Sequence, residues 1–141
     1  MPKLVNVALS GERCKSTALD LQQIFSAWSE LEFAVLVGSR AAGTEHADSD
    51  WDIALFWCHD LPWLERVAKT ETLRRECARA LGEAEARIDL IDLANANLAM
   101  RAAVAEEGLP LIGDDSVAWA RFLRRTWREV EDFYWEKEHA A

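Results

Sequence analysis

Short apolar runs separated by amphipathic segments predict the main elements of this chain. The run from Phe33 to Val37 is continuously apolar, which is typical of a buried strand. Two further runs, 50–57 and 87–93, place acidic residues among apolar ones and also indicate strands. A short extended segment is expected at 109–112. We therefore expect a small sheet whose strands come from separate parts of the chain.

Helical spacing of apolar residues fills the intervals between these runs. In the second of the expected helices, Asp60 can cap the start and Gly82 can end the last turn. Either Asp114 or Asp115 is expected to open the last helix. The predicted helices cover 16–29, 62–81, 97–107 and about 115–138.

No repeat, low-complexity tract or Pro/Gly-rich linker divides the chain. Its 141 residues, half of them hydrophobic, fit one packed domain, 1–141. Helices alternating with strands indicate an α/β fold, with a small mixed sheet flanked by helices. No apolar run approaches the length of a membrane span, and the first residues lack a signal-peptide pattern, so we expect a cytoplasmic protein without a membrane partner.

The charge of the chain argues against a nucleic-acid substrate. The formal net charge is −9 and the pI is near 4.8, which opposes binding to a polyanionic backbone. The one basic stripe, on the last predicted helix, consists of Arg121, Arg124, Arg125 and Arg128. We interpret it as a solvated face paired with Glu129, Glu131 and Asp132, and a stripe that docks an acidic protein partner is the alternative.

The segment from Gly38 to Asp52 carries the candidate chemistry. Gly38-Ser39 ends the first strand, ten residues follow, and Asp50 and Asp52 then lie two positions apart at the next strand. Side chains alternate along a strand, so the two carboxylates share one face and Trp51 lies on the other. Two carboxylates so placed can bridge a pair of Mg²⁺ ions. The alternative is a Gly-Ser loop before an edge strand with solvated aspartates.

The Gly38-Ser39 turn is suited to phosphate. Glycine lets the backbone approach a ligand, Ser39 adds a hydroxyl donor, and the residues from Arg40 can begin a helical turn with free N–H groups. Arg40 is a candidate triphosphate ligand, and a solvent-facing arginine is the alternative. Gly43 is expected to end this short helix in a left-handed conformation.

This pattern resembles the DNA polymerase β-like nucleotidyltransferase superfamily, and within it the minimal nucleotidyltransferases, whose signature is Gly-Ser, ten residues, then Asp-x-Asp. One departure is Ala42, where many relatives carry a second arginine. The run 87–93 offers the third carboxylate that such a site needs, as Asp89 or Asp92, and strand alternation places these two on opposite faces. The resemblance puts the third acid at Asp89, which would bind the catalytic metal and help to deprotonate the attacking hydroxyl. Asp92 is expected to interact with the following turn, Asn95 to Asn97.

Little sequence remains for a domain that binds an acceptor, so the acceptor is expected to come from a partner. This agrees with a resemblance to MntA-type antitoxins, which are paired with HEPN-domain ribonuclease toxins. The resemblance implies transfer of AMP from Mg-ATP to a tyrosine of the toxin, in a hetero-oligomer with it. Catalysis would use Asp50, Asp52 and Asp89 with two Mg²⁺ ions, and Gly38, Ser39 and Arg40 would bind the nucleotide. A small-molecule nucleotidyltransferase and an antitoxin that acts by binding alone are the alternatives.

Overall fold

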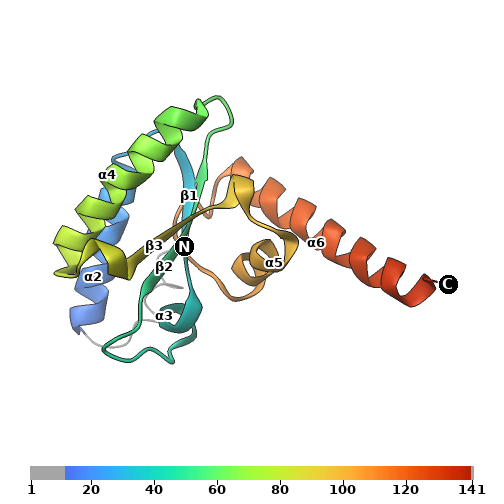
Figure 1. Ribbon diagram of the computed structural model, residues 1–141, viewed down its shortest axis with the longest axis horizontal. Coiled ribbons are helices and arrows are strands. Elements are labelled where there is room, and N and C mark those ends of the chain that lie inside the picture. Colours follow the sequence, from blue (N-terminus) through green and yellow to red (C-terminus); the bar gives the residue numbers. More distant parts are fainter. Residues whose placement is uncertain (1–11, 141) are drawn as a thin grey trace.

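The first two strands form the centre of a four-stranded sheet (Figure 1). In this computed structural model, which describes residues 12–140, β1 (Leu31–Val37) pairs antiparallel with β2 (Trp51–Trp57). On their outer sides, β3 (Ile88–Asp92) pairs parallel with β2, and β4 (Leu109–Ile112) pairs antiparallel with β1. The sheet is therefore mixed, with the order β3-β2-β1-β4, and the strands expected from the apolar runs are confirmed.

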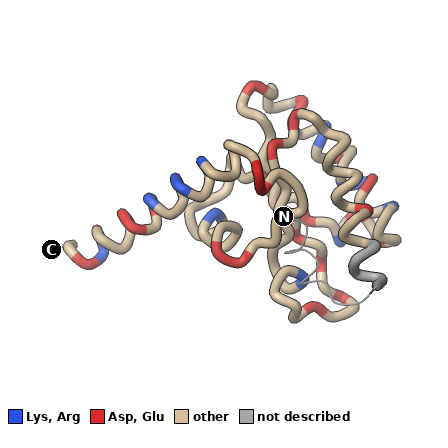
Figure 2. The backbone as a smooth tube through the Cα atoms, turned by 180° about the vertical axis from the view of Figure 1, so that it is seen from behind, with Lys and Arg blue, Asp and Glu red and all other residues tan. Residues whose placement is uncertain are grey.

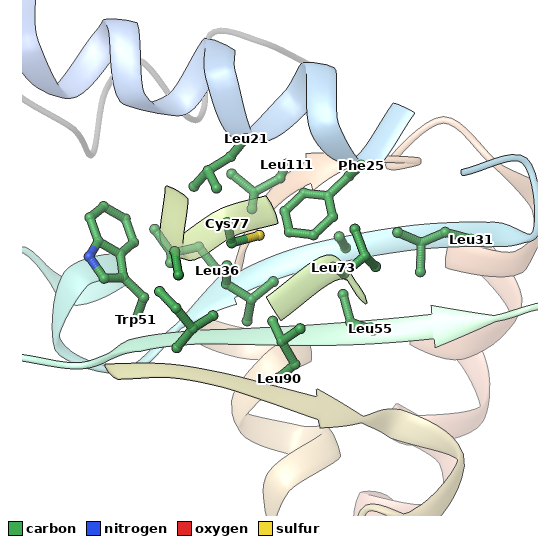
Figure 3. Packing of buried hydrophobic residues seen from close by; sticks show 14 of the residues in the cluster. Leu21, Phe25, Leu31, Leu36, Trp51, Leu55, Leu73, Cys77, Leu90 and Leu111 are labelled. Carbon is green, nitrogen blue, oxygen red and sulfur yellow. The ribbon is translucent and has the colours of Figure 1, made fainter. Parts of the chain in front are cut away.

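One face of the sheet is covered by α2 (Glu12–Ser26) and α4 (Trp63–Leu81). Alternate strand residues such as Leu36 and Leu90 point to this face and pack against Phe25 of α2 and Leu73 of α4 (Figure 3). The side chain of Cys77 lies inside the same cluster, and burial raises the pKa of its thiol to about 12. At neutral pH this cysteine behaves as a small apolar residue.

The opposite face is covered by α5 (Leu98–Glu107) and by the first turns of α6 (Val117–His139). Phe33 of β1 is at the centre of this cluster, with its ring centroid 4.9 Å from those of Phe56 and Trp119 and 5.4 Å from that of Phe122. These offset and edge contacts are the geometries that aromatic rings favour. Residues of β2 and of the last helix thus share one aromatic cluster.

The rest of α6 projects away from the sheet (Figure 1). Every residue from 131 to 140 is exposed, and Figure 2 shows basic positions along the middle of α6 and acidic ones toward its end. The expected pairing of the arginine stripe is found for Arg125, whose guanidinium lies 3.2 Å from Glu129, and the same carboxylate also binds Arg101 of α5. Of the tryptophans on this helix, Trp119 packs in the core, whereas Trp127 and Trp135 are exposed.

Several helix ends differ from the expectations. The helix expected at 16–29 spans Glu12–Ser26. Asp60 does not cap α4, because Pro62 is the N-cap residue and Asp60 instead contacts His59 at 2.8 Å. Neither Asp114 nor Asp115 opens α6, since the cap is Ser116, whose Oγ accepts the N–H of Trp119 and donates to the carbonyl of Gly113.

Other expectations for helix bounds and helix ends are confirmed. Gly82 ends α4 in the left-handed conformation, and Gly43 does the same for α3 (Gly38–Ala42). The helix expected at 97–107 is α5, with Asn97 as its cap. Within the described part of the chain, no helix is both long and apolar enough to cross a membrane.

Two left-handed glycines allow a test of how tightly the sheet is packed. At Gly113 (φ 80°) a Cβ would overlap the carbonyl oxygen of Glu32 and lie 2.7 Å from the Cβ of Phe33, whereas at Gly82 (φ 66°) it would meet nothing within 4 Å. Gly82→Ala should lower the free energy of unfolding by about 1 kcal/mol, through backbone strain alone. Gly113→Ala should lower it by a further ~2 kcal/mol or more, because strand backbone must shift. Urea unfolding of both variants measures the difference, and equal losses would contradict the packing described.

Candidate active site

Asp52 and Asp89 are brought side by side by the pairing of β2 with β3. In the register of these parallel strands Asp52 is opposite Asp89, and across β1 it is opposite Val37. Asp52 is partly buried, on the sheet face covered by α5 and α6. Burial first, and then the charges of Asp89 and Asp50, raise the pKa of Asp52 above its ordinary value. The two carboxylates therefore form a close pair of like charges.

Asp50 lies just before β2, close enough to raise the pKa of Asp52 by its charge. Its own carboxylate makes an ion pair with Arg87, with Oδ1 3.4 Å from Nε. In the part of the chain that the structure describes, no three acidic, histidine or cysteine side chains converge on one point. The site thus consists of the Asp52–Asp89 pair and a nearby third acid that faces an arginine.

Asp92 lies on the other side of the sheet, as the alternation of the strand predicts. Its Oδ2 is 2.8 Å from Nε of Arg66 on α4, and its Oδ1 accepts the N–H of Ala94. The expected interaction with the following turn is thus a cap at Ala94, just before Asn95. The ion pair with Arg66 was not foreseen. These contacts give Asp92 a role in holding the end of β3 onto α4.

Gly38 lies directly against Asp52. It begins α3 with φ 76°, and a Cβ added there would overlap the Asp52 carboxylate and lie 3.2 Å from its Cγ. The absence of a side chain at Gly38 is therefore needed for the position of Asp52. Ser39 follows in the first turn of α3, whose N–H groups have no partner within the helix. The short helix begins at Gly38, two residues earlier than expected.

Arg40 is bound to the protein itself. Its Nη2 donates to the carbonyl of Ser49 at 2.8 Å, and its guanidinium lies 4.2 Å from the centroid of the Trp51 ring. Its side chain is half-buried, so the freely solvated arginine considered above is not what the structure contains. These contacts hold the side chain of Arg40 against the turn that carries Asp50.

Arg87 is a residue of the site that sequence reasoning missed. It ends the 3-10 turn η1 (Glu85–Arg87) before β3, and besides its ion pair with Asp50 its Nη2 lies 3.4 Å from the carbonyl oxygens of Ala47 and Ser49. Only its position two residues before Asp89, just ahead of the strand that pairs with β2, could have indicated this contact. That signal requires the register of the sheet.

Asp50 and Asp89 are exposed, and Asp52 is partly buried. A cavity of about 520 Å³ is found at the opposite end of β2, lined among others by Phe56, Leu93 and Phe122. It contains none of the three acids. We place the site at the acids and not at this cavity, because carboxylate oxygens can bind metal ions and the adjoining Gly38 turn can bind phosphate.

Comparisons with known proteins agree with this geometry. The family model described as polymerase beta, nucleotidyltransferase matches residues 20–117, a range that includes Gly38, Asp52 and Asp89. No curated protein sequence matches the chain significantly.

Among solved structures, a toxin-antitoxin complex with AMP-PNP is 25% identical, with a TM-score of 0.64, over 87% of this chain and 91% of that chain. A mutant MntA-HpeT toxin-antitoxin complex is 23% identical, with a TM-score of 0.67, over 86% and 92%. A tri-AMPylated HEPN toxin from Shewanella oneidensis in complex with MNT antitoxin is 21% identical, with a TM-score of 0.63, over 88% and 92%. The last two show a shared fold.

The expected polymerase beta-like nucleotidyltransferase fold is thus confirmed, and the expected likeness to an MntA-type toxin-antitoxin protein is found at 25% identity. The match to the family model covers more than half of the residues and spans every strand of the sheet. This chain belongs to the polymerase beta nucleotidyltransferase family.

Proposed function

We propose that this protein is an antitoxin that transfers AMP from Mg-ATP to a tyrosine hydroxyl of a HEPN ribonuclease toxin, and that it does so in the cytoplasm. The observation that carries the proposal is the Asp52–Asp89 pair with Gly38 against it, in a chain of the nucleotidyltransferase family. The choice of acceptor is supported by the solved complex in which a HEPN toxin bound to an MNT antitoxin is AMPylated.

The acidic cluster suits Mg²⁺. It offers carboxylate oxygens only, which are the donors that Mg²⁺ prefers. A cation among them would offset the like charge that raises the pKa of Asp52. In this proposal Asp50 and Asp52 would hold both ions, and Asp89 would also bind the catalytic one. When bound, the ions neutralise the triphosphate and lower the pKa of the attacking hydroxyl.

The chain's own groups then divide the remaining work. The N–H groups of Gly38 and Ser39 bind phosphate oxygens at the start of α3, next to Asp52. Asp89 is exposed, so an acceptor hydroxyl can reach it and transfer its proton there. The tyrosine oxygen forms a bond to the α-phosphorus as the bond to the bridging oxygen breaks, and pyrophosphate leaves. Arg40 supports the nucleotide indirectly, through the turn that carries Asp50.

The partner supplies the acceptor, and α6 is the surface on which we propose that it docks. Trp127, Phe133, Tyr134 and Trp135 are exposed large aromatic side chains on its projecting part. Arg124 and Arg128 are exposed on the same helix. Aromatic residues and arginine are enriched at the centres of protein interfaces. Remote contacts of this kind hold a protein substrate in line for attack.

The decisive experiment incubates the protein with its HEPN partner and Mg-ATP and weighs the partner by mass spectrometry. The wild type should add one or more AMP groups, and Asp50→Asn and Asp52→Asn should each reduce the rate by about a hundredfold or more. Circular dichroism of the variants checks that they fold. Neutralisation of the toxin without any AMP adduct would mean that binding alone is the function. AMP transfer only to small molecules would mean that the protein is a small-molecule nucleotidyltransferase.

Asp89 and Asp92 provide a matched pair of substitutions on one strand. Asp89→Asn should lose most turnover while ATP binding is largely kept, because Asp89 faces Asp52. Asp92→Asn should leave turnover nearly unchanged and lower the free energy of unfolding by up to about 1 kcal/mol, since its ion pair with Arg66 is only partly exposed. Single-turnover kinetics and urea unfolding measure the two effects. If Asp92→Asn instead lost more turnover than Asp89→Asn, the site would lie on the side of β3 that faces α4.

The docking surface can be tested separately from the nucleotide site. Replacing Trp127, Arg124 and Arg128 together by alanine should raise KM for the partner about tenfold or more, with unchanged ATP affinity by calorimetry. A matched control replaces Trp63, Arg75 and Arg79, which are exposed on α4 behind the other face of the sheet. The control should modify the partner normally. If both triple variants behave alike, the partner docks elsewhere.

A further inference from the structure

The turn before β2 is held by two arginines from different parts of the chain. Arg40 of α3 donates to the carbonyl of Ser49 at 2.8 Å, and its ring contact with Trp51 fixes its guanidinium. Arg87 reaches the same turn from the start of β3, with longer contacts of 3.4 Å to the carbonyls of Ala47 and Ser49. Because short hydrogen bonds are the stronger ones, Arg40 is the main anchor of the turn.

Arg87 makes one contact that Arg40 does not. Its Nε lies 3.4 Å from Oδ1 of Asp50, and the two side chains are 30% and 56% exposed. Among the described residues, Asp50 makes no other ion pair. Arg87 is thus the cation that faces Asp50 in the structure.

The other two acids of the site have no such partner. Asp52 and Asp89 are opposite each other in the register of β2 and β3, and no ion pair to either occurs within the described residues. With Asp50 facing Arg87, the three carboxylates do not converge on one point. A metal ion that uses all three must therefore compete with Arg87 for Asp50.

We infer that Arg87 is a positioning residue that serves as the internal counter-ion of Asp50: it pairs with this carboxylate when the site is empty and yields it when a divalent cation enters. The inference rests on the proposed metal site. Arg40 keeps the turn in place throughout, since its bond to Ser49 does not involve the carboxylate. Arg87 then sets how readily the metal binds, without touching nucleotide or acceptor.

This arrangement has an unusual consequence for mutation. Removal of a residue that only supports the fold can weaken metal binding. Removal of a competing counter-ion strengthens it, because Asp50 is released to the metal. Partly exposed ion pairs are modest in energy, so the expected gain in metal affinity is about two- to fivefold.

The test titrates the full-length protein with Mn²⁺ alone and follows free Mn²⁺ by electron paramagnetic resonance. Arg87→Met should bind Mn²⁺ about two- to fivefold more tightly than the wild type, and Arg87→Lys, which keeps the charge, should stay close to it. Arg74→Met is the matched control. Arg74 bonds the carbonyl of Ile88 and pairs with Glu71 from the other side of the sheet, so its loss should leave Mn²⁺ affinity unchanged.

A double variant shows whether the effect passes through Asp50. In the background of Asp50→Asn, the change Arg87→Met should no longer alter Mn²⁺ affinity. Unchanged or weaker binding by a folded Arg87→Met variant would overturn the counter-ion role while the metal site stands. Failure of the wild type itself to bind Mn²⁺ would overturn the metal site and, with it, this inference.

Discussion

The parallel pairing of β2 with β3 is the constraint on which the candidate site depends. It sets Asp52 opposite Asp89, although 36 residues, including the whole of α4, lie between them in the sequence. Parallel neighbours need such a crossover, and α4 supplies it while burying Leu73 and Cys77 against the sheet. A slip of one residue in this pairing would turn Asp89 toward α4 and place the alternating apolar residues of β3 in the wrong layer. The same register of β2 with β3 is therefore required both for packing of the core and for placement of the acids.

The sheet face that carries the acids is divided along its length. At the end where β2 begins, Asp52, Asp89 and Gly38 lie together. At the other end, Phe33, Phe56 and the first turns of α6 form the aromatic cluster. The first turns of α6 are held by that cluster and by the ion pairs of Glu129, whereas its aromatic end is exposed. One face thus positions both the chemistry and the surface proposed for the protein substrate.

Much of this arrangement could be predicted from the sequence because strand alternation has a fixed period of two. That period placed Asp89 and Asp92 on opposite faces of β3 without knowledge of the neighbouring strands, whereas the choice of Asp89 as the third acid came from the family resemblance. Helix starts were predicted less well, since several nearby polar residues compete for each cap and Ser116 prevailed over Asp114 and Asp115. The contacts of Arg40 and Arg87 could not be predicted, because they depend on which turns the sheet register brings together.

The close fit between Gly38 and Asp52 has a genetic consequence. A side chain at position 38 meets two separate obstacles, a left-handed backbone and the Asp52 carboxylate. A change that shortened residue 52 enough to make room would also remove the carboxylate for which the room is needed. A second-site suppressor of a Gly38 substitution therefore cannot arise at Asp52. At this contact, a suppressor screen can recover only true reversion to glycine.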